Sequence, residues 1–470
     1  MQKVAGKLIF SPTDLKTFQE SPFASWMDRY GIEFPEKAPQ KDPVDPLLKK
    51  LAEKGYRHED LTEQSFVDEG LSVHSMTRDS TVSDTLLAMQ TGYDVIAQAK
   101  LEKESFAGFS DFLIRVPGKS DLGDYHYEVW DTKLSKSLKP SYPIQLCCYA
   151  EMLNELQGIL PEKLTLVLGD GKRAPLLTKE HFAFYKDLKS RFLSFHSEFN
   201  PEFEPDPAGS KSWGNWSQYA EKILLEQDHL FQVATITRAQ IKKLNAARIH
   251  TLTELANTTI SHVKGISPEV FQRLVHQAAI QLQSRGNQIP DYRVIHHDNS
   301  LRRGLTLLPP HSDGDVFFDI EGYPLVSGGL EYLWGVTYFD DGSRQFRDFW
   351  AHDAEQEKQA FIEFIGWVYK RWQNDPTMHI YHYAQHEITT CRKLMGRYGV
   401  CEYEVDELLR NEVFIDLYKI VKGAILIGEP RYSIKNVEHL YREKRQTEVG
   451  NGGESVVVYD EWRNAYLAGH

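Results

Sequence analysis

Cysteine is scarce in this chain, and long apolar runs are missing from it. The 470 residues contain four cysteines: Cys147 and Cys148 are adjacent, while Cys391 and Cys401 lie far away along the chain. None of them forms a C-x-x-C pair, so the sequence predicts neither a disulfide framework nor a zinc site, and they are most simply packing residues. No run approaches the roughly 18 to 20 apolar residues that span a bilayer, and the first ten residues lack the apolar core of a signal peptide. We therefore expect a cytoplasmic protein with no membrane partner.

Positive charge is also in deficit. The chain has 54 Lys and Arg residues against 67 Asp and Glu residues, which gives a formal net charge of −13. This balance excludes a protein that coats nucleic acid through bulk electrostatics. It does not exclude an enzyme that clusters acids around a cation, because the cation and a local basic surface then meet the phosphates of the substrate.

One stretch of the N-terminal half reads as two adjacent strands that lead into a helix. Asp111 lies on the first strand, and Asp131 and Lys133 lie two apart on the second, so the period of a strand places the latter two on one face. Gln145 and Tyr149 have the i, i+4 spacing that places them on one face of the following helix. Two carboxylates and an ammonium around one point suit phosphodiester hydrolysis, because the acids hold a divalent cation and the lysine steadies an attacking or leaving oxygen. The alternative is a strand edge with solvated charges.

These residues resemble the motifs of the RecB-like PD-(D/E)XK nucleases. The matching elements are an Asp in Gly-Phe-Ser-Asp111, the D-x-K triplet Asp131-Thr-Lys133, and the Q-x-x-x-Y pair Gln145 and Tyr149. Such nucleases also carry a G-x-x-H-E element upstream, and Gly55-Tyr-Arg-His58-Glu59 stands before the strands. Single pieces of the pattern are weak, since other D-x-K triplets begin at Asp14, Asp170 and Asp187, but the elements follow the order of the family.

The resemblance implies a restriction-endonuclease-like α/β core over residues 1–205. It also implies that His58, Asp111 and Asp131 bind Mg²⁺ or Mn²⁺, and that Gln145 and Tyr149 orient DNA or the metal-bound water beside the catalytic Asp111, Asp131 and Lys133. For His58 the alternative is a helix residue whose hydrogen bonds are satisfied locally. For Tyr149 the alternative is a packing role.

RecB-like nucleases with an iron–sulfur cluster place one cysteine just before a proline near the N-terminus and three more after the nuclease core. Here Ser21 precedes Pro22, and the region after the core has no cysteine. Four cysteine thiolates are the usual ligands of such a cluster. We therefore expect no iron–sulfur cluster.

A shift in composition begins near residue 206. Over 206–288 there is no good strand, but amphipathic helical patterns recur. The piece 263–274 resembles a helix-hairpin-helix, in which a glycine-containing turn offers backbone N–H groups to a DNA phosphate. A plain helical spacer between two catalytic domains is the alternative.

The segment 289–470 resembles the RNase H-like domain of the DEDD exonucleases. A buried-strand run from Val316 leads to Asp319 and Glu321, which share a face and match the D-x-E motif that binds two metal ions in that family. The second motif is matched by a strand running into a helix, with Glu387 where most relatives have Asp, and Asp416 is expected to be a supporting acid. A RecB-like nuclease, a helical linker and an RNase H-like domain occur together in a nuclease family whose longer members continue into a helicase.

The last motif of the DEDD exonucleases has no match. It needs an Asp in Y-x-x-x-D or H-x-x-x-x-D, yet no tyrosine after Asp416 has an Asp four residues later, and we expect the helix that carries this motif to be missing. The RNase H-like site is therefore expected to be incomplete.

Three hypotheses follow from the sequence. The leading one is a divalent-metal-dependent nuclease that cleaves DNA at the N-terminal site. The second is a 3′-5′ exonuclease at Asp319, Glu321 and Glu387. The third is a catalytically silent scaffold that binds nucleic acid and positions a helicase partner.

Overall fold

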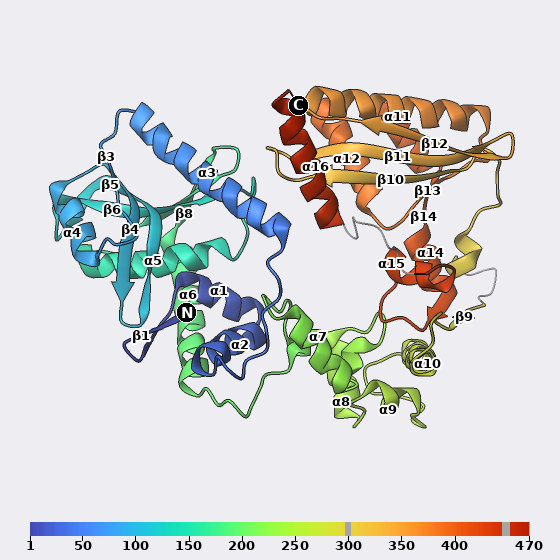
Figure 1. The fold of residues 1–470 in the computed structure, drawn as a ribbon, viewed down its shortest axis with the longest axis horizontal. Helices are drawn as coiled ribbons and strands as arrows, with labels where there is room; N and C mark the ends of the chain where they lie inside the picture. Colours follow the sequence, from blue (N-terminus) through green and yellow to red (C-terminus); the bar gives the residue numbers. More distant parts are fainter. Residues whose placement is uncertain (297–301, 444–451, 470) are drawn as a thin grey trace. The chain divides into compact units, whose positions relative to one another are not determined.

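The computed structural model describes residues 1–296, 302–443 and 452–469. The chain divides into two compact units, Met1–Ile223 and Leu224–His470. Figure 1 shows the N-terminal unit in blue to green and the C-terminal unit in green to red. Each unit combines helices with a mixed sheet, so the predicted α/β class is confirmed.

The N-terminal unit is built from one larger sheet, a small hairpin and the helices around them. Its elements are β1 (Gln2–Val4), β2 (Lys7–Ile9), α1 (Pro12–Glu20), α2 (Pro22–Glu33), α3 (Pro46–Asp68), β3 (Val73–Ser75), α4 (Val82–Thr91), β4 (Val95–Lys103), β5 (Phe106–Ser120), β6 (Gly123–Lys133), α5 (Tyr142–Gln157), β7 (Lys163–Leu168), β8 (Arg173–Leu177) and α6 (Thr178–Ser197). The larger sheet has the order β3-β4-β5-β6-β7-β8, and α7 (Ser217–Glu226) spans the boundary between the units. The two strands and the helix predicted around Asp131 are β5, β6 and α5.

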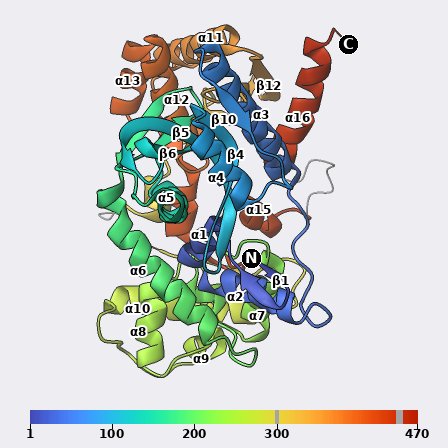
Figure 2. The same cartoon turned by 90° about the vertical axis from the view of Figure 1, so that its left-hand side faces the viewer.

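Side chains of the larger sheet alternate between its two faces, as the period of a strand requires. Phe112 of β5 packs edge to face with Phe66 of α3 on one face, with 5.3 Å between ring centroids. The next residue, Leu113, belongs to the cluster formed with α5 on the other face. The sheet therefore lies between α3 and α5 (Figures 1 and 2). Cys147 and Cys148 of α5 are buried in this cluster, which confirms their predicted packing role.

The C-terminal unit begins with helices and continues into a second sheet. Its elements are η2 (Leu230–Gln232), α8 (Arg238–Ala246), α9 (Leu252–Ala256), α10 (Pro268–Gln283), β9 (Tyr292–Val294), η3 (Gly304–Leu307), β10 (Val316–Tyr323), β11 (Leu330–Asp340), β12 (Ser343–Trp350), α11 (Ala354–Asn374), β13 (Ile380–His382), α12 (His386–Tyr398), α13 (Glu402–Arg410), β14 (Phe414–Asp416), α14 (Leu417–Ala424), β15 (Ile425–Ile427), α15 (Ile434–Val437), η4 (Glu438–Leu440) and α16 (Gly452–Leu467). The main sheet has the order β12-β11-β10-β13-β14. Strands β10, β11 and β12 form antiparallel hairpins, whereas β13 and β14 continue the sheet in parallel.

Helices cover both faces of this sheet. On one face, Phe364 of α11 stacks on Phe318 of β10 with 4.3 Å between ring centroids. On the other face, Tyr459 of α16 stacks on Tyr332 of β11 with 3.8 Å between centroids. The sheet is therefore the middle layer of this part of the unit (Figure 1).

Most of the predicted helical segment, from residue 224 on, belongs to the C-terminal unit. Helices α9 and α10 form a hairpin with a shared apolar core, and the turn before α10 contains Gly265 at φ +83°. Gln277 of α10 donates from Nε2 to the carbonyl oxygen of Ile427 at 2.8 Å and accepts from the Tyr432 hydroxyl at 2.8 Å. These buried polar contacts fix α10 against β15.

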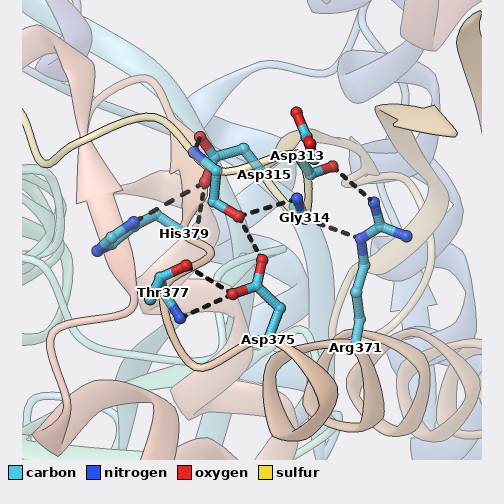
Figure 3. Close-up of polar contacts among 8 residues, drawn as sticks. Asp313, Gly314, Asp315, Arg371, Asp375, Thr377 and His379 are labelled. Atoms are coloured by element: carbon cyan, nitrogen blue, oxygen red, sulfur yellow. Dashed lines mark hydrogen bonds and ion pairs between the residues drawn. The ribbon is translucent and has the colours of Figure 1, made fainter. Parts of the chain in front are cut away.

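A polar network fixes the start of β10 relative to β13 (Figure 3). The Asp315 carboxylate accepts from the backbone N–H of His379 at 2.8 Å, just before β13 begins. The Asp375 carboxylate accepts from the backbone N–H and the hydroxyl of Thr377 at 3.0 and 2.6 Å. Arg371, near the end of α11, donates from Nε to a backbone carbonyl in the loop before β10 at 2.8 Å. This network stabilises the register between β13 and β10, the strand that carries Asp319 and Glu321.

Candidate active sites

The first candidate site lies where β6 ends. The Asp131 carboxylate is 1% exposed and forms an ion pair with the Lys133 ammonium, as expected for residues on one strand face. In the antiparallel register, Phe112 lies opposite Trp130, so the neighbouring Asp111 lies beside Asp131. Asp111 Oδ2 accepts from the backbone N–H and the hydroxyl of Thr132 at 2.8 and 2.9 Å. The structure thus brings the D-x-K pair and the earlier aspartate together.

Glu59 of α3 joins this site, although the sequence did not single it out for a role. Burial and the negative charge of Asp111 raise the pKa of Glu59 to about 7. Its carboxylate accepts a hydrogen bond from the Gln98 amide, and Gln98 lies within β4 at a φ of +52°. The available signal was its position directly after His58 in the G-x-x-H-E element, where only the histidine was expected to bind metal.

His58 contacts the neighbouring strand β7. Its Nε2 lies 3.3 Å from the carbonyl oxygen of Val167 and therefore acts as the donor, because a carbonyl oxygen only accepts. Metal-binding histidines commonly donate their other ring N–H to a backbone carbonyl. The contact leaves Nδ1 as the nitrogen that could bind metal, and the ligand role of His58 stays a prediction.

Gln145 and Tyr149 reach the same site from α5. The Lys133 ammonium donates to Gln145 Oε1 at 3.5 Å. The buried Tyr149 ring lies so close to Gly108 of β5 that a Cβ there would be 2.9 Å from the tyrosine hydroxyl oxygen. Burial, together with the negative charges of Asp131 and Asp111, raises the pKa of Tyr149, which keeps its hydroxyl protonated as a hydrogen-bond donor.

The donor set of this site suits a hard divalent cation. Asp131 Oδ2 forms the ion pair with Lys133, whereas the buried Oδ1 has no hydrogen-bond partner among the described residues. Burial together with the charge of Asp111 raises the pKa of Asp131 to about 7 against the effect of Lys133. A buried carboxylate oxygen without a donor is costly, and a cation bound by the carboxylate oxygens reduces that cost. Within the described ranges, no group of three or more His, Cys, Asp or Glu side chains has the arrangement of a metal site. Binding would therefore require the acids to move closer around the ion.

The second candidate site lies on β10 and at the start of α12. Burial and the negative charge of Glu387 raise the pKa of Asp319, and burial with the charge of Asp319 raises the pKa of Glu321. Glu387 is buried, and its Oε2 lies 3.4 Å from Nδ1 of His382. The structure thus brings the three predicted acids together, and their carboxylate oxygens again suit Mg²⁺ or Mn²⁺.

Other polar residues near this site have structural contacts. Asp416 Oδ1 accepts from the backbone N–H groups of Tyr418 at 2.9 Å and Ala384 at 3.0 Å, so it caps α14 and fixes the loop before α12. The C-terminal helix α16 brings the Ser455 hydroxyl to Glu321. This hydrogen bond partly offsets the effects that raise the pKa of Glu321. Asp460 of α16 accepts a hydrogen bond from the buried Tyr323 hydroxyl instead.

A family comparison matches the domain that carries the second site. The sequence model of the RNase_H_2 family, described as RNase H superfamily, matches residues 316–466. The matched span starts at β10, ends within α16 and includes Asp319, Glu321 and Glu387. The C-terminal domain is therefore RNase H-like, with a nuclease-type fold, as predicted.

The matched span does not include the N-terminal unit, so the RecB-like assignment of that unit stays a prediction. A comparison of the chain with curated proteins gave no match. In the part of the chain that the structure describes, no helix is both long enough and apolar enough to cross a bilayer.

Proposed function

We propose that this protein is a divalent-metal-dependent nuclease that hydrolyses phosphodiester bonds of DNA at Asp111, Asp131 and Lys133. The observation that carries the proposal is the buried Asp131 carboxylate, which pairs with the Lys133 ammonium through Oδ2, keeps Oδ1 without a hydrogen-bond partner among the described residues, and lies beside Asp111. Mg²⁺ or Mn²⁺ bound by these acids, with His58 and Glu59, would activate water and neutralise charge on the phosphate. In this proposal the partner is DNA, with a helicase as a further partner.

The chain's own residues would perform distinct tasks around the phosphate. Lys133 supplies a positive charge next to the attacking or leaving oxygen, where charge develops in the transition state. Tyr149 offers a protonated hydroxyl, and the Gln145 amide contacts Lys133, so both orient the substrate side of the site. Glu59, whose pKa is raised to about 7 in the metal-free site by burial and by the charge of Asp111, would lose its proton when it binds the cation.

The test compares Asp131→Asn and Lys133→Met with the unchanged protein. Each substitution keeps the approximate size of the side chain but removes a charge needed mainly in the transition state, so we expect cleavage to fall by at least about 10²-fold. The assay digests labelled single- and double-stranded DNA and RNA with Mg²⁺ or Mn²⁺, beside a chelator control.

A matched control lies in the same unit. The triplet Asp170-Gly-Lys172 has the D-x-K pattern, but it lies in the exposed turn between β7 and β8. Asp170→Asn and Lys172→Met should keep full activity. Wild-type cleavage by Asp131→Asn or Lys133→Met, in a folded protein as judged by circular dichroism, would show that the N-terminal site is misassigned.

A second candidate function is 3′-5′ exonuclease activity of the RNase H-like domain. Two observations favour it: the family match over residues 316–466 and the convergence of Asp319, Glu321 and Glu387. Cleavage that persists in Asp131→Asn and disappears with Asp319→Ala would identify this domain as the enzyme.

A further inference from the structure

A pocket with aromatic walls opens beside Glu321, between β11, β12 and α16. Its volume is about 560 Å³. The residues that matter to its chemistry are Glu321, Tyr332, Trp350, Ser455, Tyr459 and Trp462. The pocket therefore adjoins the acids of the RNase H-like domain directly.

An irregularity in the sheet forms the inner wall. The β10–β11 pairing shifts between Glu321 and Gly322, so that Leu333 pairs with Glu321 and Glu331 pairs with Gly322. Tyr332 is the extra residue, and such a bulge re-aims side chains. Its ring lies parallel to that of Tyr459, with 3.8 Å between centroids and 13° between planes.

Hydrogen bonds hold this wall in place. The Tyr332 hydroxyl lies 2.6 Å from Ser455 Oγ, and the Tyr459 hydroxyl lies 2.9 Å from His352 Nδ1. Since both rings are buried and fixed by polar contacts, they form a rigid inner wall of the pocket.

The outer wall is open to solvent. Trp350 is 48% exposed and Trp462 is 44% exposed, although both line the pocket. The Trp462 ring continues the aromatic row, with its centroid 5.7 Å from that of Tyr459 and an angle of 26° between the planes. Exposed aromatic surface of this kind, next to a polar site, marks a ligand-binding surface.

We propose that this pocket binds an unstacked nucleobase of a single-stranded nucleic acid whose adjacent phosphate lies at Asp319 and Glu321. This inference rests on the proposed action of the RNase H-like domain on nucleic acid. The walls suit a base rather than a phosphate, because the charged side chain in the pocket is the Glu321 carboxylate. Base–aromatic stacking tolerates any sequence, since every base has a π-face. A base inside a duplex is already stacked and paired, so the proposed occupant is a single strand.

The first test measures binding by the full chain in the presence of chelator, which prevents metal-dependent cleavage. The probes are a fluorescein-labelled oligothymidine and a duplex of the same length. Trp462→Ala should weaken single-strand binding by about tenfold, the range of one lost stacking contact, while Trp462→Phe should stay within about threefold of the unchanged protein. Binding of the duplex should not change.

The matched control is Tyr403→Ala, which removes an aromatic residue of α13 that is 67% exposed and lies outside this pocket. It should bind the oligothymidine like the unchanged protein. An abasic residue moved along the strand should cost the unchanged protein a similar factor at one position, and should cost Trp462→Ala nothing further at that position.

A photo-crosslinking experiment tests the same pocket without substitution. A strand containing 5-bromodeoxyuridine should crosslink to Trp462 or Trp350, as read by peptide mass spectrometry. Crosslinks found only elsewhere would overturn the proposal, as would unchanged oligothymidine binding by Trp462→Ala. Either result leaves nucleic-acid binding by the chain standing, whereas failure of the unchanged protein to bind or cleave any nucleic acid overturns the proposed function as well.

Discussion

The Asp131 carboxylate has an unusual balance of forces. Burial and the nearby Asp111 raise its pKa to about 7, and Glu59 is raised to about 7 by burial and the same neighbour. A carboxyl group whose pKa is raised in the folded state contributes stability that is present below its unfolded value, near 4, and is lost as the pH rises through about 7. A cation that binds the anionic form reverses this trend.

We therefore expect a pH-dependent difference between the metal-free wild type and Asp131→Asn. As the pH rises from about 5 to about 8, the melting temperature of the wild type should fall relative to that of the variant, because the variant has no charge to bury at this position. Over the same range the wild type should bind Mn²⁺ more tightly as its acids lose their protons.

Thermal unfolding of both proteins with chelator, followed by calorimetric titration with Mn²⁺, measures the two effects. The control substitution Asp170→Asn should give a curve parallel to that of the wild type. Parallel curves for the wild type and Asp131→Asn would contradict the expected ionisation of this buried carboxyl.

Residues were predictable where the relevant distance is short along the chain. Asp131 and Lys133 share a strand face by period alone, and Asp111 lies on the strand that pairs with theirs. Glu59 was not predicted as part of the site, because its approach to Asp111 depends on how α3 packs across the sheet. Such long-range packing leaves no pattern in the sequence around Glu59.

At the scale of the element, a buried glutamate ties α5 to α6. Glu151 accepts hydrogen bonds from the Tyr185 hydroxyl at 2.5 Å and from the ammonium groups of Lys186 and Lys189 at 2.6 Å each. Burial alone would raise its pKa, but these donors outweigh burial and hold the pKa at about 2. The contact fixes the helix that carries two of the predicted site residues.

We expect Glu151→Gln to lower the free energy of unfolding of the N-terminal unit by about 3 kcal/mol, because it leaves the buried Lys189 ammonium beside an uncharged partner. The stability that the carboxylate contributes is present above its unfolded pKa near 4 and is lost as the pH falls toward 2. The difference from the wild type should therefore shrink below about pH 4.

Urea unfolding at pH 7 and pH 3 checks this prediction. Glu155, one turn further along α5, has a 49% exposed side chain and pairs with Lys103, so Glu155→Gln should change stability by less than about 1 kcal/mol. Equal stability of the two variants at pH 7 would show that the buried contact does not hold the helices together.

Elements with a clear period were predictable, and those that tertiary contacts decide were not. The sequence predicted two adjacent strands and a following helix, which the structure shows as β5, β6 and α5. It did not predict β8, a short edge strand that contains Pro175, a residue that disfavours central strands. The sequence also did not predict the helix α16, since three consecutive valines from Val456 favour a strand. Tyr459 of this helix packs on Tyr332 of the sheet, and that tertiary contact overrides the local preference.

At the scale of the whole molecule, each compact unit has its own cluster of acids. Two-metal catalysis needs carboxylates on two ions about 4 Å apart. In the C-terminal unit, α16 brings the Ser455 hydroxyl to Glu321, and Asp460 of the same helix accepts a hydrogen bond from the Tyr323 hydroxyl. The N-terminal unit has Asp131 beside Asp111 and Lys133 instead.

We therefore expect the combined Asp319→Ala and Glu321→Ala substitutions to leave most nuclease activity, whereas Asp131→Ala removes it. Digestion of labelled DNA in Mg²⁺ compares the two proteins, and crystals soaked in Mn²⁺ should show metal near Asp111 and Asp131. Loss of activity in the double variant alone would reverse the assignment and make the C-terminal domain the enzyme.

Amino-acid composition predicted that the chain changes character near residue 206, but it did not predict where the N-terminal unit ends. The helical character begins near residue 206, but the compact N-terminal unit extends to Ile223. The reason is that Trp216 packs with Trp26 of α2 and donates from Nε1 to Asp28 at 3.0 Å. Composition marks where strands stop, but it does not show which core a following helix joins.

The contact between Lys133 and Asp131 affects whether the chain can fold before it binds a metal ion. In a protein whose fold depends on a metal ion, the anionic ligands repel one another in the absence of the ion, and the chain stays unfolded until the ion binds. Here the chain supplies its own counter-ion two residues away, so the acids can be gathered at the end of β6 during folding. When the metal ion binds, it replaces the Lys133 ammonium as the cation next to Asp131. We expect the displaced ammonium to become free for the substrate at the moment when the site becomes able to act on it.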